Sequence, residues 1–389
     1  SPVGSMLQRT WRIDETGEIG TVTVQFDLTG LNPPSTDPAD IHLLVDTDSD
    51  FSTGATNVVA SSYSSNTATF TLVGFDDGAY FTVAVENGAL VVNSTSDSGD
   101  TNPGDGTCYT GFNNSETNPQ CTLRAAIEEA NARSGADTIT FDIPSTESGH
   151  SGGIWTISPG FALPDLTDAV TIDATTQTGW TSTPVVELNG IGAGGTTDGL
   201  QILSANVEIR GFAINRFGGD GIKVESTSTG NVAIAGNHIG LDPTGLIDLG
   251  NGGRGIDLQT GSGPTTVGGT AAADRNIIAG NGSNGVIIWG SDGNTVIGNY
   301  VGTDVTGNAS IPNGQDGIYL GGTSDNNTIG QPGAGNVLSG NGHDGLELND
   351  ASTGNVIQAN IIGLGADGTT IVANVRHGVV IYNGVNNTQ

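Results

Sequence analysis

The repetitive half of this sequence contains few residues that could perform acid–base chemistry on a substrate. Arg210, Arg216 and Lys223 are the basic candidates, and Asp220 is the nearest acid. A strong base of this kind, helped by cations that neutralise a carboxylate, could drive elimination across a uronate residue. Arg210 and Lys223 are expected on neighbouring strands, where they would share a face. If the chain is such an enzyme, Arg210, Lys223 and Asp220 are its predicted catalytic residues.

Hydrolysis of a neutral glycan would need two carboxyl groups, about 5–9.5 Å apart. Asp220, Asp316 and Asp344 each stand directly before a glycine that recurs along the chain. An aspartate repeated at one corner is more typical of a turn cap than of a catalytic pair. The sequence therefore favours a structural role for these three aspartates.

Three aromatic side chains are expected to face the same way. Trp289, Tyr319 and Tyr382 follow the recurring glycine by an even number of residues, and alternate residues of a strand point to one side. Aromatic rings on one face can stack against sugar rings, and ordinary packing beneath a loop is the alternative. The pattern makes Trp289, Tyr319 and Tyr382 carbohydrate-stacking candidates.

Two acidic loops could bind calcium, which prefers carboxylate oxygens. Their residues are Asp46, Asp48 and Asp50 in the first loop, and Asp97, Asp100 and Asp105 in the second. The first loop is not an EF-hand, because Phe51 stands where that loop needs glycine. Calcium is the predicted cofactor, and solvated acidic turns are the alternative.

The two cysteines, Cys108 and Cys121, are separated by a loop rich in Gly, Asn and Pro. An even number of cysteines at short range favours a disulfide and an oxidising compartment. Two free thiols are the alternative.

The charge balance argues against two classes of partner. The chain has 10 Lys and Arg against 41 Asp and Glu, a formal net charge of −31. Such a surface repels phosphate backbones and anionic lipids, so nucleic acid is not an expected partner. No apolar run is long enough for membrane insertion. A saline habitat and bound calcium both explain the acidity.

A repeat of 28 to 34 residues fills the C-terminal half. A glycine followed by an aliphatic residue marks each unit, at Gly221, Gly255, Gly285, Gly317, Gly345 and Gly378. Apolar and polar residues alternate after the glycine, as in 346–349, which predicts strands. Units of this length suit single turns of a parallel β-solenoid. Recurrent asparagines suit corners and stacked amide ladders.

The sequence divides into three parts. Residues 1–90 are expected to form a small β-sandwich-like domain with several short alternating strands. Residues 91–150 form a junction, in which residues 122–133 are the one amphipathic helix, with Glu128 and Glu129 facing solvent. Residues 151–389 form the solenoid, whose open end the helix would cap.

The repeats of residues 150–389, with Asn-x-Ile-Gly and Asn-x-Ile-x-Gly-Asn motifs, resemble the right-handed parallel β-helix of pectin-lyase-like proteins. Residues 121–132 and 137–141 resemble the CSLREA-type segment that precedes such helices in large bacterial surface and secreted proteins. The resemblance implies an all-β fold and a bacterial protein that is secreted or on the cell surface. It is specific for fold and not for chemistry, because this fold carries lyases, glycoside hydrolases and non-enzymes.

The sequence favours an extracellular structural or adhesive rod. The chain stops just after the start of a turn, at residues 385–389, so end-to-end self-assembly into a filament is expected, and a fragment of a longer protein is the alternative. The rival function is a polysaccharide-active enzyme, a lyase or a glycoside hydrolase. An enzyme would show a cleft in which ionisable groups with perturbed pKa values converge, and a rod would show smooth faces.

Overall fold

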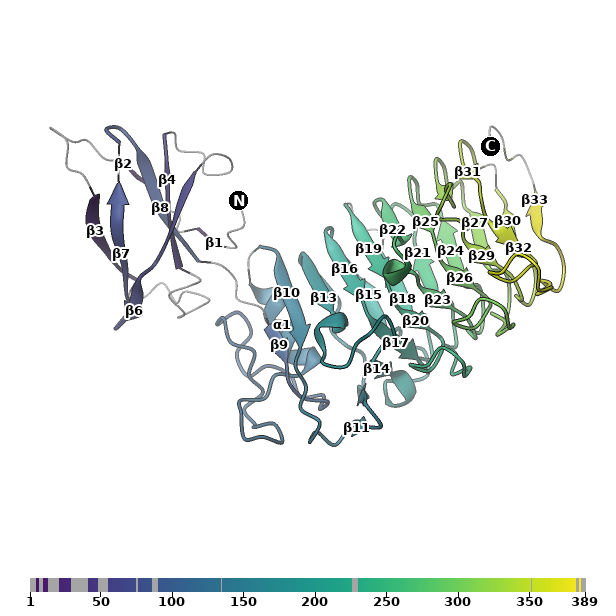
Figure 1. Cartoon of the computed structure of the whole chain (residues 1–389), viewed down its shortest axis with the longest axis horizontal. Helices are drawn as coiled ribbons and strands as arrows, with labels where there is room; N and C mark the ends of the chain where they lie inside the picture. The colour runs from purple at the N-terminus through teal and green to yellow at the C-terminus, as the bar shows by residue number, and fades with distance from the viewer. Residues whose placement is uncertain are drawn as a thin grey trace.

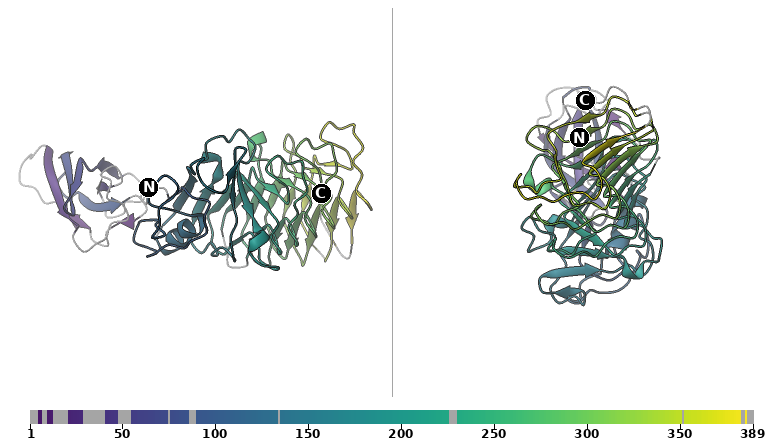
Figure 2. Two further views of the ribbon diagram at one scale, coloured as in Figure 1. Left: turned by 90° about the horizontal axis from the view of Figure 1, so that it is seen from below. Right: turned by 90° about the vertical axis from the view of Figure 1, so that its right-hand side faces the viewer.

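The main body of the computed structural model is a right-handed parallel β-helix, as predicted (Figure 1). The structure describes residues 5–6, 10–12, 21–28, 41–47, 55–74, 76–85, 90–133, 135–225, 230–350, 352–382 and 385. Three long sheets run along the β-helix, and from β13 (Val170–Asp173) onward successive turns of the chain visit each sheet in order. Figure 2 shows the stacked turns from two further directions.

The three sheets are built from short strands separated by corners. Sheet 1 contains β9 (Leu90–Val92), β10 (Asp137–Phe141), β13 (Val170–Asp173), β16 (Val207–Arg210), β19 (Val232–Ala235), β22 (Thr265–Gly268), β25 (Thr295–Ile297), β28 (Thr328–Ile329) and β31 (Val356–Ile357). Sheet 2 contains β11 (His150–Ser151), β12 (Ile154–Ile157), β14 (Val186–Asn189), β17 (Phe212–Asn215), β20 (His238–Ile239), β23 (Ile277–Ile278), β26 (Tyr300–Val301), β29 (Val337–Leu338) and β32 (Ile361–Ile362). Sheet 3 contains β15 (Leu200–Ile202), β18 (Ile222–Val224), β21 (Ile256–Leu258), β24 (Val286–Trp289), β27 (Ile318–Gly321), β30 (Leu346–Leu348) and β33 (Val379–Ile381).

The recurring glycines lie in one column, as predicted. Each of them directly precedes a strand of sheet 3, and those strands pair in parallel register from Ile222 with Ile256 to Leu346 with Val379. The aliphatic residues after the first five of these glycines are buried in one continuous core that extends through the β-helix, whereas Val379, on the last turn, is exposed. The column of glycines therefore fixes the register of sheet 3.

Asparagine ladders hold the corners, also as predicted. In one ladder, Asn276 donates its side-chain N–H to Oδ1 of Asn299 (3.0 Å), which donates in turn to Oδ1 of Asn336 (3.0 Å). Asn299 also donates to the carbonyl oxygens of Val267 and Ile297. The asparagines are fully buried, and each one satisfies backbone groups that would otherwise lack a partner.

The β-helix begins earlier than the sequence predicted. β9 pairs in parallel with β10, through Ile139 and Leu90, and β10 pairs with β13. The predicted start at residue 151 is wrong, because the weak sequence repeat of the first turns hides strands whose backbone pairing is regular. The segment assigned to a junction supplies the first strands of sheet 1.

The predicted capping helix is α1 (Leu123–Ala132), with Thr122 as its N-cap. Leu123, Ala126, Ile127 and Ala130 join the core of the β-helix. The expectation that both glutamates face solvent is wrong. Glu129 is fully buried, where it accepts N–H groups of the loop at 104–106, and Glu128 accepts the N–H of Asp100. The loop backbone needs acceptors, and the helix supplies them.

The N-terminal part has two antiparallel sheets. The larger contains β1 (Ser5–Met6), β2 (Trp11–Arg12), β4 (Ile41–Asp46), β5 (Thr56–Val59) and β8 (Tyr80–Val85). The smaller contains β3 (Thr21–Asp27), β6 (Ser62–Ser64) and β7 (Thr67–Gly74). Both sheets contribute to one core, with Leu43 and Val83 from the larger and Phe70 from the smaller. A small β-sandwich-like domain is consistent with this arrangement. Among the described residues, no helix combines the length and apolar character that a membrane crossing requires.

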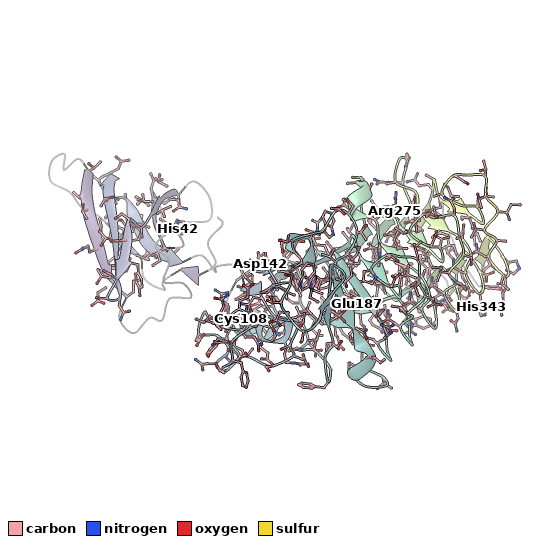
Figure 3. All side chains as sticks on the ribbon, turned by 60° about the horizontal axis from the view of Figure 1, so that its bottom comes forward. His42, Cys108, Asp142, Glu187, Arg275 and His343 are labelled. Carbon is pink, nitrogen blue, oxygen red and sulfur yellow. A yellow bond between two sulfur atoms is a disulfide. The ribbon has the colours of Figure 1, made fainter. Side chains whose placement is uncertain are left out.

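A disulfide joins Cys108 to Cys121, with their Cα atoms 5.2 Å apart. Figure 3 places Cys108 at the N-terminal end of the β-helix. The bond closes a short loop directly before α1. Replacing both cysteines with serine is expected to lower the free energy of unfolding by about 3 kcal/mol, because the crosslink restricts the unfolded chain. Denaturant titration measures the loss, and two reactive thiols in the denatured, unreduced wild type would contradict the bond.

Candidate functional site

The outer face of sheet 3 collects the chemically active side chains. The residues that flank the middle of each strand point into the core, so the middle residue points outward. Register stacks these middle residues in one column of Gln201, Lys223, Asp257, Ile287, Tyr319, Glu347 and Val380. One side chain of this column lies on each turn.

The aspartates before the recurring glycines cap the corner, as the sequence indicated. Oδ1 of Asp220 accepts the N–H of Arg254 (2.6 Å), one turn further along. Oδ1 of Asp316 accepts the N–H of Asp344 (3.0 Å) in the same way, and Asp344 accepts the N–H of His377 (2.7 Å). The capping role leaves these carboxylates beside the column of middle residues.

A groove of about 590 Å³ crosses sheet 3 between β21 and β30. It is lined by Arg254, Gln259, Ser283, Asn284, Ile287, Trp289, Gln315, Asp316, Tyr319, His343 and Glu347. Amide, hydroxyl, aromatic and carboxyl groups thus share one concave surface. Figure 3 shows His343 among the C-terminal turns.

Trp289 and Tyr319 form an aromatic platform in the groove. Their rings are nearly parallel (14°), with centroids 6.2 Å apart, and Trp289 is 41% exposed. Gly321 pairs with Trp289 in register, and a Cβ atom on Gly321 would lie 2.5 Å from the ring of Tyr319. A side chain at this position would therefore displace the ring of Tyr319.

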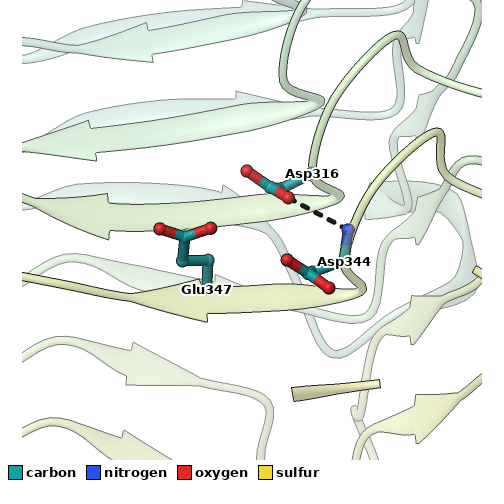
Figure 4. Close-up of side chains that lie close together, drawn as sticks. All are labelled: Asp316, Asp344 and Glu347. Atoms are coloured by element: carbon teal, nitrogen blue, oxygen red, sulfur yellow. Dashed lines mark hydrogen bonds between the residues drawn. The ribbon is translucent and has the colours of Figure 1, made fainter. Parts of the chain in front are cut away.

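Asp316, Asp344 and Glu347 form a carboxylate cluster (Figure 4). One oxygen atom from each lies within 4.8 Å of the others. Burial raises the pKa of Asp316 and of Glu347, and the neighbouring carboxylates raise both further. Asp316 and Glu347 therefore hold their protons more tightly than ordinary acids, and the cluster is the group of described residues that could hold a metal ion.

Arg254 marks the other end of the groove. Its Nη1 atom lies 3.0 Å from Oδ2 of Asp257 and 3.6 Å from Oδ2 of Asp220. Gln259 donates to the same oxygen of Asp257 (2.6 Å). Asp257 is fully buried, and burial raises its pKa to about 6, although Arg254 acts in the opposite direction. The guanidinium is thereby fixed by two carboxyl groups.

The pKa of Asp257 predicts a pH-dependent stability. Between its ordinary value of 3.8 and about 6, the folded state binds more protons at this site than the unfolded state. This contribution is therefore present at low pH and lost as the pH rises through about 6. Asp257→Asn is expected to remove this pH dependence. The free energy of unfolding of the variant, relative to that of wild type, should therefore rise by on the order of 2 kcal/mol from pH 4 to pH 7.

Thermal melts of both proteins across this range measure the effect, with Asp165→Asn as an exposed control. The stability of wild type alone does not isolate Asp257, because His238 changes the stability with pH in the opposite direction. The difference between variant and wild type cancels the contribution of His238. Burial lowers the pKa of His238 to about 4, so its contribution is lost as the pH falls below its ordinary 6.5. A difference between Asp257→Asn and wild type that is constant with pH would contradict the assignment.

The structure separates the predicted lyase residues. Arg210 ends β16 on sheet 1, beside Glu208 (3.2 Å), whereas Lys223 lies on β18 of sheet 3, 2.6 Å from Glu225. The prediction of a shared face is wrong, because the chain turns two corners between these residues, the first at Gly211 with φ = 85°. Asp220 lies just before β18, where it accepts the backbone N–H of Arg254 and lies 3.6 Å from its guanidinium.

The structure does not bring the second set of calcium candidates together. Asp97 binds Arg124 (2.9 and 3.0 Å), and Asp100 accepts the N–H groups of Asn102 and Tyr109. Asp105 accepts from Asn102 and from the N–H of Thr107. The carboxylate oxygens of all three aspartates thus accept hydrogen bonds from other groups of the protein. Of the first set, Asp46 ends β4, and Asp48 and Asp50 lie outside the described residues.

Two of the three aromatic candidates lie in the groove. Trp289 and Tyr319 lie together in the groove, whereas Tyr382 follows β33, is 44% exposed and does not line it. Sequence reasoning missed Asp257, Asn284 and Glu347. The alternation in residues 346–349 already placed Glu347 outward, but only the stacked register shows which side chains are its neighbours.

Comparisons with known proteins give the following matches. A family model described as a domain of unknown function (DUF8202) matches residues 2–99. No curated protein matches the sequence.

Among solved structures, the mannuronan C-5 epimerase AlgE6 A-module of Azotobacter vinelandii is 14% identical, with 68% of this chain and 92% of that chain covered and a TM-score of 0.23. The AlgE4 A-module of the same organism is 13% identical, with 69% and 94% covered and a TM-score of 0.22. The catalytic domain of a GH87 α-1,3-glucanase in complex with nigerose is 13% identical, with 96% and 68% covered and a TM-score of 0.20. These neighbours are polysaccharide-active β-helix proteins, and matches at these TM-scores assign no activity to this chain.

Proposed function

We propose that the chain is an extracellular protein that binds a polysaccharide along the outer face of sheet 3. The groove with the stacked Trp289–Tyr319 pair carries the proposal. Aromatic rings bury the apolar face of a sugar, while side chains such as Asn284 and Gln315 supply hydrogen bonds to its hydroxyl groups. A cleft in which ionisable groups with perturbed pKa values converge is the expected mark of an enzyme, and the groove is not the smooth face expected of a structural rod.

The dimensions of the groove suit a linear glycan. Successive turns of the β-helix are about 4.8 Å apart, which is comparable to the length of one sugar ring. The groove extends over four turns, from β21 to β30. A chain of several sugars that runs parallel to the β-helix axis would therefore meet a new set of polar side chains at each turn.

The negative charge of the groove limits which polysaccharides it can bind. Asp316, Glu347 and the adjacent Asp344 carry the negative charge of the groove, whereas the guanidinium of Arg254 is held by Asp220 and Asp257. A uronate or sulfate ester would add like charges to this surface, at a free-energy cost. The groove is thus suited to sugars without negative charge.

Affinity electrophoresis through gels that contain neutral or acidic polysaccharides tests the proposal. Retardation by at least one neutral polysaccharide is expected, and retardation only by uronate polymers would contradict it. Equal mobility in every gel would also contradict it.

Glycoside hydrolysis is a second candidate function, favoured by the raised pKa of Asp316 and of Glu347 in the same groove. An acid whose pKa is raised holds its proton more tightly than an ordinary carboxyl group and can protonate the leaving oxygen of a glycosidic bond. Glu347 would be this acid and Asp316 its partner. One oxygen atom of each lies within 4.8 Å of the other, which is closer than the roughly 6.5–9.5 Å between the carboxyl groups of inverting enzymes.

The hydrolytic activity has a direct assay. Wild type is expected to release reducing ends from a bound polysaccharide, and Glu347→Gln to release them at least about a hundredfold more slowly. Binding without release of reducing ends would leave binding as the function, and equal rates for both proteins would contradict the role of Glu347.

The other properties of the proposal follow from the sequence. A disulfide and an acidic surface suit a secreted or cell-surface location. Adhesion to an extracellular polysaccharide, calcium binding and end-to-end self-association are parts of the same proposal. Calorimetric titration with calcium, and sedimentation over a concentration series, test the last two.

A further inference from the structure

We propose that the groove on sheet 3 selects a polysaccharide whose sugars carry protonated amino groups. This inference rests on the proposed function, since it names the class of sugar that the same groove binds. It follows from the carboxylate cluster, its position beside the aromatic platform, and the pairing of the nearest arginine.

The first step is the charge that a ligand would meet. Asp316 and Glu347 line the groove directly, and Asp344 lies within 4.8 Å of both. The guanidinium at the opposite end, on Arg254, is already paired with Asp257 at 3.0 Å. Arg254 therefore does not neutralise the acidic end of the groove. The cationic groups that act there are His343 on Asp316, Arg376 on Glu347 and His377 on Asp344, so the three carboxyl groups are only partly compensated.

The second step is the hydrogen-bonding capacity of the cluster. Asp316 accepts the N–H of Asp344 and the amide of Asn284, and Glu347 accepts the amide of Asn349 on Oε1. Within the described part of the chain, the hydrogen bonds leave Oε2 of Glu347 and Oδ2 of Asp344 without a donor. An ammonium group carries three N–H donors and one positive charge, which Oε2 of Glu347 on the wall of the groove can use, while the buried Asp344 adds its negative charge from behind.

The third step is the position of the platform. Tyr319 and Glu347 are paired in register on adjacent strands, so their side chains lie side by side on the outer face. A sugar stacked on Tyr319 would thus hold a substituent of its ring against Glu347. A bare metal ion would use the carboxylates but would leave the aromatic platform without a role, which favours an amino sugar as the occupant.

The experiment compares two oligosaccharides of equal length, a glucosamine tetramer and an N-acetylglucosamine tetramer, by isothermal titration calorimetry. At about pH 6 an amine of this kind is protonated. The glucosamine tetramer is expected to bind at least about tenfold more tightly, and the preference is expected to shrink as salt rises.

Two variants make the test specific. Glu347→Gln keeps the shape of the side chain and is expected to abolish the preference. Glu208→Gln changes the net charge equally but lies on sheet 1, and is expected to keep it. Thermal melts establish that both variants are folded.

The outcomes separate the inference from the proposed function. Equal affinity for both tetramers would overturn the inference and leave glycan binding intact. A preference that survives Glu347→Gln would also overturn it, because the charge would act elsewhere. Absence of binding to either tetramer and to every neutral polysaccharide would overturn both.

Discussion

Trp289→Ala is expected to lower the affinity for a bound glycan by about ten- to hundredfold. The indole is 41% exposed in the groove and stacks on Tyr319, so a sugar that covers it removes much of the remaining apolar surface from water. Loss of about 1.5–3 kcal/mol, the usual value for burying such a side chain, corresponds to this range of affinity. Titration calorimetry with the polysaccharide that retards the wild type measures the change.

The matched control for this prediction is Phe112→Ala. Phe112 is an aromatic residue with 62% exposure in the loop between the two cysteines, far in sequence from sheet 3. Its loss is expected to leave affinity unchanged. Equal effects of the two substitutions, or an unaffected Trp289→Ala, would show that the platform does not bind the glycan.

Asn299→Ala is expected to lower the free energy of unfolding of the β-helix by roughly 3–5 kcal/mol, since each buried group left without a partner costs about 1–3 kcal/mol. The substitution removes the acceptor of the Asn276 side chain and the donor to the carbonyl oxygens of Val267 and Ile297. Chemical denaturation followed by circular dichroism measures the loss.

Asn118→Ala is the control for the ladder, because Asn118 is exposed on the loop before α1. A change of less than about 0.5 kcal/mol is expected for it, as for most surface substitutions. If Asn299→Ala cost no more than this control, the ladder would not stabilise the β-helix.

The fold was largely predictable because each turn of the repeat has the same residue types at equivalent positions. Gly285 and Gly317 mark a corner, the following aliphatic residue enters the core, and asparagines such as Asn299 satisfy the corner backbone. The start of the β-helix was not predictable, because β9 and β10 lack the glycine motif. The burial of Glu129 depends on a loop that is distant in sequence.

The site was only partly predictable, for a geometric reason. Counting residues from the glycine placed Trp289 and Tyr319 on one face correctly, since both lie on sheet 3. The expectation that Arg210 and Lys223 share a face failed, because two corners separate their strands and place them on sheets 1 and 3. The sequence identified Asp316 and Asp344 as turn caps but did not reveal that Glu347 lies beside them.

The central claim is that a polysaccharide lies in the groove of sheet 3. Hydroxyl-radical footprinting, which oxidises exposed aromatic side chains, tests it most directly when it is performed with and without a saturating neutral oligosaccharide. Protection of Trp289 and Tyr319 is predicted, with unchanged oxidation of Phe112 and Phe161, which are both exposed outside sheet 3. Protection of Phe112 or Phe161, with Trp289 and Tyr319 oxidised as fast as before, would contradict the account.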